Sequence, residues 1–210
     1  IFSEYMFIKN FRHDTKFSKK IMIENQEELE KIKLQKKPVI FISGHFSNFE
    51  LMAMHLEKSN INLAAVYRPL NNKFLNPLME RIRKKYICKK QIKKGISGTK
   101  ELLKEFKNGT SIALMIDQRV SEGIKSELFG QKALTTTIPA QFIKKFDTAV
   151  VPIYIERLTD DTFQLKILNA VKFSRNETTS DITNKLNKIL EKMIMTNPEQ
   201  WIWTHSRWKI

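Results

Sequence analysis

A histidine and a glutamate stand five positions apart in VIFISGHFSNFELMAMHL, residues 39–56. The opening apolar run ends at Ser43-Gly44, and an apolar helical pattern begins behind Glu50. Imidazole and carboxylate together suit general base catalysis: the carboxylate accepts from one ring nitrogen while the other nitrogen takes a proton. Positions five apart on a regular helix point about 140° away from each other. The pair can therefore meet only if His45 lies on the turn and Glu50 lies in the first helical turn.

The same turn also has a purely structural interpretation. Ser47-Asn48-Phe49-Glu50 fits the S-x-x-E capping box, with Ser47 as the N-cap. A capping box explains Glu50 without any chemistry, but it leaves His45 unexplained. Because a first-turn glutamate can reach back toward the turn, we expect Ser47 to cap the helix and Glu50 to hold His45.

The hydrophobic pattern predicts the elements that would position these residues. Short apolar runs indicate strands at 20–24, 38–43, 62–67, 111–116, 149–156 and 162–167. Amphipathic segments indicate helices at 1–11, 26–34, 48–57, 73–85, 97–107, 137–146 and 181–196. Strands alternating with helices predict a single α/β domain over residues 1–210, with a mostly parallel mixed sheet flanked by helices. In such sheets ligands bind at the carboxyl ends of strands, which is where His45 falls.

Charged side chains follow two other predicted strands. Asp117 comes directly after the apolar run SIALMI, so it belongs on the same sheet edge as His45. Alternatively, Asp117 begins a turn or pairs with Arg119. Arg68 follows the strand at 62–67 and precedes Pro69, which favours an extended backbone. An arginine there could hold a phosphate or carboxylate through two hydrogen bonds, or could be an ordinary surface residue.

The bulk composition narrows the classes of partner. A formal charge of +15, from 37 Lys+Arg against 22 Asp+Glu, implies nucleic acid, an anionic membrane surface or a phosphate-bearing substrate, although an AT-rich coding bias also raises lysine content. The single cysteine excludes an intrachain disulfide framework, and the four scattered histidines give no zinc spacing, so no metal site is predicted.

No apolar stretch approaches the roughly 18 to 20 residues that span a bilayer. The opening IFSEYMFIKNF nevertheless resembles the tail of a helix already under way. We therefore expect an upstream segment before residue 1.

Four blocks of sequence together resemble one known family, the bacterial lipid A late acyltransferases (lauroyl and myristoyl transferases). SGHFSNFEL resembles their form of the H-x4-D/E acyltransferase motif, and AAVYRPLNNKFLNPLMERIRKK looks like their Tyr-Arg-Pro segment and basic helix. IALMIDQRVSEGIKSELFGQKALTTTIPAQFIKKFDTAVVPIYIERL is similar to their Asp-Gln strand end, Phe-Gly loop and Thr-rich turn. PEQWIWTHSRWK resembles their terminal signature. The blocks occur in the family's order and cover most of residues 38–208.

The resemblance implies a fold like that of the glycerolipid acyltransferases and a specific reaction. An acyl chain would move from an acyl carrier protein thioester to a hydroxyl of a 3-hydroxyacyl chain on a phosphorylated lipid A precursor. The resemblance also implies an N-terminal membrane helix before residue 1. The implied location is the cytoplasmic face of the bacterial inner membrane, with its anionic surface as a further partner. The carrier thioester is a co-substrate, and no other cofactor is implied.

The resemblance also implies roles for individual residues. His45 matches the general base and Glu50 its orienting carboxylate. Arg83 aligns with a functional arginine in the helix after Tyr-Arg-Pro, but Arg81 lies close by, so the choice between the two stays open. Asp117 matches an acidic residue at a strand end. We expect Arg68, the arginine of Tyr-Arg-Pro, to bind substrate together with Arg81, Arg83 and Asp117.

Other functions remain as alternatives. The acceptor could be glycerol phosphate, a lysophospholipid or a glycolipid, because H-x4-D/E is shared across such enzymes, and the donor could be coenzyme A. A basic nucleic-acid-binding domain would use the same charge, but no recognised nucleic-acid motif is present. The Trp201, Trp203 and Trp208 indoles, beside Arg207, could be interfacial membrane anchors or core packing.

Overall fold

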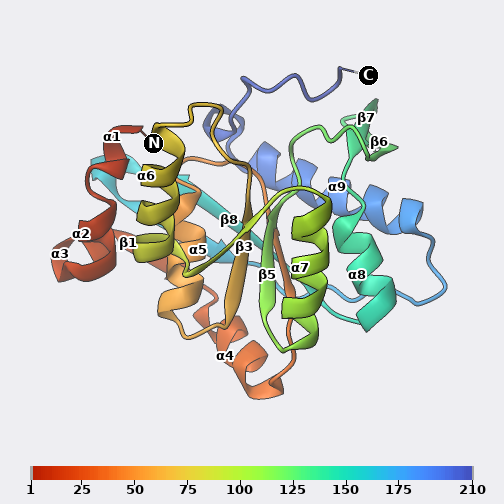
Figure 1. Cartoon of the computed structure of the whole chain (residues 1–210), viewed down its shortest axis with the longest axis horizontal. Helices are drawn as coiled ribbons and strands as arrows, with labels where there is room; N and C mark the ends of the chain where they lie inside the picture. Colours follow the sequence, from red (N-terminus) through yellow and green to blue (C-terminus); the bar gives the residue numbers. More distant parts are fainter. Residues whose placement is uncertain (1, 210) are drawn as a thin grey trace.

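The computed structural model describes residues 2–209, which fold around one seven-stranded sheet (Figure 1). The strands are β1 (Ile21–Glu24), β2 (Ile40–Ser43), β3 (Leu63–Tyr67), β4 (Lys90–Lys93), β5 (Ser111–Met115), β6 (Ile124–Leu128), β7 (Gln131–Thr135), β8 (Val150–Arg157) and β9 (Phe163–Ile167). The α-helices are α1 (Phe2–Tyr5), α2 (Ile8–His13), α3 (Thr15–Ser18), α4 (Gln26–Gln35), α5 (Glu50–Lys58), α6 (Leu75–Ile82), α7 (Ile96–Lys107), α8 (Ile138–Phe146) and α9 (Thr179–Thr196). Short turns η1 (Arg83–Ile87), η2 (Thr159–Asp161) and η3 (Pro198–Gln200) complete them.

The sheet is mixed but mostly parallel, as the sequence predicts. Its order is β1-β9-β8-β2-β5-β3-β4, and only the β8–β9 pair is antiparallel. The central strand β2 is buried along its whole length, which explains its unbroken apolar run. In Figure 1 the carboxyl ends of β3 and β5 lie at the upper edge, beside the start of α6 and the C-terminal segment.

Two strand regions were missing from the sequence prediction. The edge strand β4 has the sequence KQIK, in which Ile92 is the buried side chain. The pair β6–β7 forms an antiparallel hairpin whose turn residues, Phe129 and Gly130, both have positive φ. Two successive left-handed residues are typical of a two-residue hairpin turn, so the alternating pattern around Phe-Gly was the available signal.

Two helix predictions need correction. Of the helix predicted at 1–11, Ile1 lies outside the described residues, and the rest is divided into α1 and α2 by a turn at Met6-Phe7. The helix predicted at 73–85 is α-helical only to Ile82 and then forms the π-helical turn η1, with Cys88 N–H donating to the Arg83 carbonyl. A π-turn adds a residue to the helical turn and often occurs at functional sites.

None of the helices in residues 2–209 has both the length and the apolar character needed to cross a membrane.

Candidate active site

The sheet register brings the turn after β2 and the end of β5 together. Ser43 is paired with Met115 in the parallel β2–β5 ladder. His45 and Asp117 each lie two residues beyond this pair. The imidazole Nδ1 lies 2.8 Å from Asp117 Oδ1. The prediction that Asp117 lies on the same sheet edge as His45 is confirmed, and the two side chains are in direct contact.

Asp117 is a fully engaged hydrogen-bond acceptor. Besides the imidazole, it accepts from the His45 backbone N–H at 2.8 Å and from the Trp201 indole N–H at 2.9 Å, both at Oδ2. Only 3% of its side chain is exposed. The His45 ring also packs edge-on against Phe49, with ring centroids 4.7 Å apart. Four independent contacts therefore fix the turn, the ring and the carboxylate relative to each other.

The charge state of Asp117 determines the tautomer of His45. Burial alone would raise the pKa of Asp117, but the hydrogen bonds and charge of His45 and the Trp201 N–H outweigh it, and the pKa stays below its ordinary value. An ionised carboxylate can only accept hydrogen bonds, so the proton of a neutral His45 ring must be on Nδ1. The Nε2 lone pair is then the basic position, the arrangement that a general base requires.

The segment around Trp201 holds the turn from its other side. Phe46 and Trp201 form an antiparallel bridge, the Ser47 N–H donates to the Gln200 carbonyl, and the Ile202 N–H donates to the His45 carbonyl. The segment therefore behaves like a short extra strand along residues 45–47. Of the two interpretations offered for the tryptophans, core packing describes Trp201, which is buried.

Arg207 lies deeper in the same region. It is 1% exposed and donates to the Leu134 carbonyl at 2.9 Å and to Thr135 Oγ1 at 2.7 Å. Burial lowers the pKa of Arg207, and the negative charge of Asp117 partly offsets that effect. Its positive charge in turn favours the ionised form of Asp117.

Glu50 does not make the expected contact with His45. In the part of the chain that the structure describes, its hydrogen bonds come from Arg83 and Tyr5: Nε and Nη2 of Arg83 donate to Oε1 at 2.9 and 2.6 Å, and the Tyr5 hydroxyl donates to the same oxygen. The expectation that Glu50 orients the imidazole is therefore corrected, since Asp117 takes that place. The physical reason is the helix start: Glu50 is the first residue of α5, and its side chain turns toward η1 and α1 instead of back toward the turn.

The Glu50–Arg83 pair is an ion pair with little solvent access. Burial would lower the pKa of Arg83, but the Glu50 charge and the hydrogen bonds raise it above its ordinary value. Burial and the neighbouring Glu50 charge raise the pKa of Tyr5, so its hydroxyl acts as a neutral donor. The Arg83 guanidinium also lies 5.9 Å from the ring centroid of Tyr67, the last residue of β3. A carboxylate, a guanidinium and a phenol are thus held together beside the sheet edge.

The expected N-cap is also wrong. The cap of α5 is Phe49, without a side-chain hydrogen bond, and Ser47 has a left-handed backbone with φ of 41°. Since the Ser47 N–H is bound to Gln200, the turn is fixed by the Trp201 segment instead of a capping box.

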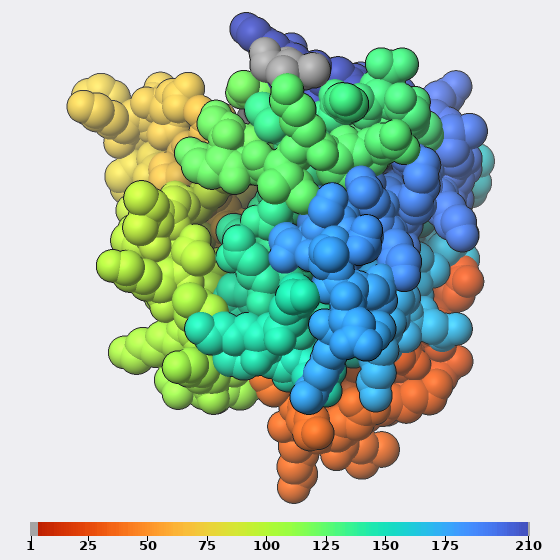
Figure 2. Space-filling model, turned by 90° about the vertical axis from the view of Figure 1, so that its right-hand side faces the viewer, coloured from red at the N-terminus to blue at the C-terminus, as the bar shows by residue number. Residues whose placement is uncertain are grey.

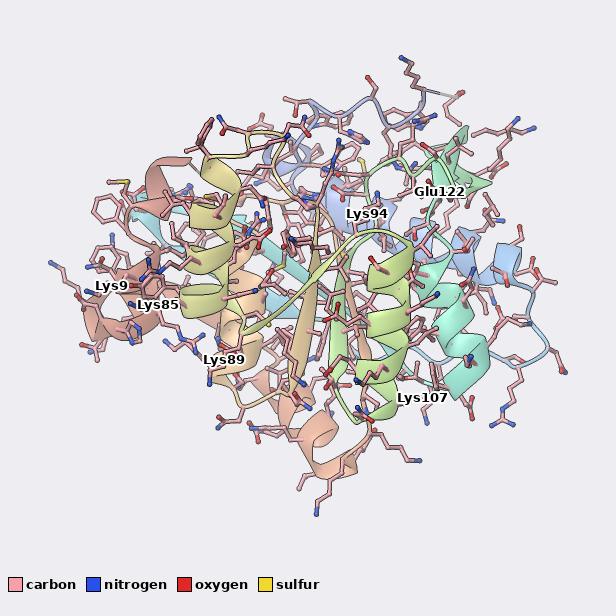
Figure 3. The ribbon with its side chains drawn as sticks, viewed as in Figure 1. Lys9, Lys85, Lys89, Lys94, Lys107 and Glu122 are labelled. Atoms are coloured by element: carbon pink, nitrogen blue, oxygen red, sulfur yellow. The ribbon has the colours of Figure 1, made fainter. Side chains whose placement is uncertain are left out.

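The structure separates the three arginines of the prediction. Arg83 reaches Glu50, whereas Arg81 is exposed on the outer face of α6. Arg68 is exposed beyond β3 and stands near Lys94: burial lowers the pKa of Lys94, Glu122 opposes the shift, and the Arg68 charge adds to it. Figure 3 shows Lys94 and Glu122 toward the upper edge, above α7.

Sequence reasoning missed Tyr5 and the indole of Trp201 as members of the site. Each lies far along the chain from the residue it contacts, at separations of 45 and 84 positions, and no spacing rule connects them. The equal offset of His45 and Asp117 from neighbouring strands was a usable signal once β2 and β5 are known to pair.

The chain is similar in sequence and in fold to known proteins. Residues 2–210 match the family described as bacterial lipid A biosynthesis acyltransferase. The chain is 24% identical over 209 residues to a lipid A biosynthesis lauroyltransferase of Escherichia coli (strain K12), and 23% identical over 205 residues to a lipid A biosynthesis palmitoleoyltransferase of the same organism. Each alignment covers 95% of this chain and 65% of the relative, so the chain spans about two thirds of their length.

A solved structure has a similar fold. The 1-acyl-sn-glycerophosphate (LPA) acyltransferase PlsC of Thermotoga maritima superposes with a TM-score of 0.52 at 15% identity, covering 87% of this chain and 73% of that one. The fold is thus shared with an acyltransferase of known structure, and the sequence match over residues 2–210 shows that this chain belongs to the bacterial lipid A biosynthesis acyltransferase family.

Proposed function

We propose that this chain transfers a fatty acyl group from a phosphopantetheine thioester to a hydroxyl of a 3-hydroxyacyl chain on a phosphorylated lipid A precursor. The observation that carries the proposal is the His45 imidazole, held at Nδ1 by the buried Asp117 at the carboxyl edge of the sheet in a chain of this family. We take acyl carrier protein as the donor, with coenzyme A as the alternative.

The proposed step follows from the tautomer. Nε2 of His45 accepts the proton of the acceptor hydroxyl as its oxygen attacks the thioester carbonyl carbon. The Asp117 carboxylate stabilises the imidazolium that forms, as an orienting carboxylate does in a catalytic triad. When the C–S bond breaks, the imidazolium returns the proton to the leaving thiolate, so no covalent enzyme intermediate is needed.

Glu50 and Arg83 have a separate role in this proposal. The Glu50 carboxylate and the Tyr67 ring hold the Arg83 guanidinium beside the edge where the acceptor binds. A guanidinium held in this way can bind a phosphate or stabilise developing negative charge. Arg68 and Lys94 add positive charge at the end of β3 and β4, suited to a phosphorylated acceptor or donor.

The test is acyl transfer by this protein from acyl carrier protein thioester to a lipid A precursor, measured by mass spectrometry. The expected product is the precursor plus one acyl chain, and His45→Ala should abolish its formation. His13→Ala, at an exposed histidine, is the matched control. Near-normal transfer by His45→Ala would refute the mechanism.

The acceptor class is tested in the same assay. Lysophospholipid, glycerol phosphate and glycolipid acceptors are offered beside the lipid A precursor, and coenzyme A thioester beside the carrier thioester. Faster transfer to one of the other acceptors would keep the chemistry of His45 and replace the proposed substrate.

A further inference from the structure

The start of α6 presents an unusual group of exposed apolar side chains. Phe74 is 92% exposed, Leu75 51% and Leu78 53%, and Leu70 just before them is 40% exposed. No residue of α6 is buried. Figure 2 shows the segment around residue 70–75, coloured gold, projecting from the upper left of the molecule. We call Leu70, Phe74, Leu75 and Leu78 the apolar tip.

The end of α6 and the following turn η1 are cationic. Arg81, Lys84 and Lys85 are exposed, one to two turns beyond Leu78. At about 1.5 Å of rise per residue, these charges begin about 4 Å behind Leu78, the innermost residue of the tip, and extend to about 10 Å behind it. Figure 3 shows Lys85 at the lower end of α6, away from the tip. We call these three residues the cationic belt.

The one carboxylate within α6 does not cancel the belt. Glu80 accepts from Asn76 Nδ2 at 2.7 Å and lies 3.3 Å from the Lys93 ammonium. Hydrogen bonds from Tyr67 and Asn76, with the nearby Lys93, hold the pKa of Glu80 below its ordinary value. Its charge is therefore balanced by Lys93, toward the sheet.

The apolar tip lies at the same sheet edge as the candidate active site. It follows β3, and Arg83, directly after α6, reaches Glu50. Two further exposed apolar side chains border this edge. Ile96, 83% exposed, begins α7 beyond β4, and Trp203 is half exposed next to Ile202, whose N–H binds the His45 carbonyl. A half-exposed indole is typical of an interfacial anchor.

We infer that the apolar tip inserts into an anionic lipid bilayer, with the cationic belt at the level of the headgroups. A projecting apolar end followed by charges within about 10 Å matches the depth of the boundary between headgroups and acyl chains. Lys and Arg near such a surface are attracted by its negative potential. A convex tip of four side chains is too small for a stable protein interface, which needs about 800 Å² from each partner.

This inference deepens the proposed function and rests on it for the lipid nature of the acceptor. With α6 docked end-on, the carboxyl edge that carries His45 faces the bilayer. An acyl hydroxyl of a membrane lipid would then reach the site without leaving the bilayer completely.

The test is cosedimentation of the 210-residue chain with vesicles of phosphatidylcholine, with and without 30 mol% phosphatidylglycerol. Wild type should bind the anionic vesicles about tenfold more tightly. Combining Phe74→Ser, Leu75→Ser and Leu78→Ser should weaken that binding about tenfold. The combined control Met22→Ser, Leu34→Ser and Leu168→Ser, at exposed apolar positions outside the tip, should bind like wild type.

A second triple variant, Arg81→Gln, Lys84→Gln and Lys85→Gln, should remove the preference for anionic vesicles. Equal binding by the tip variant and wild type, or an equal loss in the control variant, would overturn the inference. So would a tip variant that binds vesicles normally but fails to use carrier-protein thioester, because the tip would then contact a protein.

Vesicle binding does not depend on turnover. His45→Ala should still bind the anionic vesicles, and the tip variant should still acylate an acceptor dispersed in detergent. Failure of the proposed function therefore appears as absent transfer with intact vesicle binding, and failure of the docking inference appears as the reverse.

Discussion

Replacing Asp117 by Asn is the sharpest perturbation of the proposed mechanism. The side chain keeps its size, but one carboxylate oxygen becomes an NH₂ group in a place that receives three N–H donors. If the amide oxygen accepts from the backbone and Trp201 N–H groups, the NH₂ group faces Nδ1. It can only donate there, so it selects the tautomer with the proton on Nε2 and removes the basic lone pair.

The expected loss follows from two effects. A hydrogen bond to a charged group contributes about 1.5–3 kcal/mol, and about 1.4 kcal/mol is a factor of ten in rate. Loss of the charge that stabilises the imidazolium therefore costs about 10- to 100-fold. The wrong tautomer adds to this, and the comparable exchange in a serine protease triad lowers kcat by about 10⁴-fold. We expect Asp117→Asn to lower kcat by about 10²- to 10⁴-fold with a smaller change in KM.

The assay is initial-rate acyl transfer at saturating donor and acceptor, with thermal unfolding of the same preparations. Because the site is buried, an N–H group left without an acceptor costs about 1–3 kcal/mol of stability. Rates are therefore measured well below the temperature at which half of the variant is unfolded. Asp147→Asn is the matched control, because Asp147 is an exposed partner of Arg175. Its rate should equal that of the wild type.

One result would refute the reasoning. If folded Asp117→Asn keeps more than a third of wild-type kcat while Glu50→Gln loses at least a hundredfold, Asp117 does not orient the base and the original assignment to Glu50 is favoured.

Two further predictions concern stability. Arg83→Ala leaves the buried Glu50 charge without its guanidinium and should lower the free energy of unfolding by about 2–3 kcal/mol in urea titrations. Arg81→Ala, at an exposed position, should change it by less than about 0.5 kcal/mol. Equal effects of the two substitutions would contradict the Glu50–Arg83 pairing. Burial lowers the pKa of His55 to about 4 from an ordinary value near 6.5. Because the unfolded chain then binds more protons between these values, stability should fall as pH drops from about 6.5 to 4, by up to about 3 kcal/mol. His55→Gln should remove that dependence, and His13→Gln, at an exposed site, should retain it.

The predictable part of this fold is the part that local chemistry specifies. The apolar run of β2 reflects burial on both faces of a strand, and the amphipathic pattern of α9 reflects burial on one face of a capped helix. Both patterns can be recognised in the sequence without tertiary context. The edge strand β4 was missed because a strand with mostly solvated side chains lacks a distinctive apolar pattern.

The site divides in a similar way. His45 and Asp117 could be placed at one sheet edge, since both directly follow buried strands. The carboxylate that binds His45 could not be identified from the sequence. Strand order decides whether a carboxylate nearby in the sequence or a distant one lies within hydrogen-bond distance of the imidazole. Glu50 was close along the chain, but the ion pair with Arg83 and the hydrogen bond from Tyr5 depend on how η1 and α1 pack around α5.

The parallel register of β2 and β5 also limits how sequences of this kind can change length. Since Ser43 pairs with Met115, His45 and Asp117 each stand two residues beyond the last paired position. Surface loops between the two strands can gain or lose residues without affecting this alignment. One residue inserted between Ser43 and His45 would move the imidazole out of line with the carboxylate, unless a second insertion followed Met115. Insertions and deletions among related sequences should therefore fall between the strands and spare segments 43–45 and 115–117.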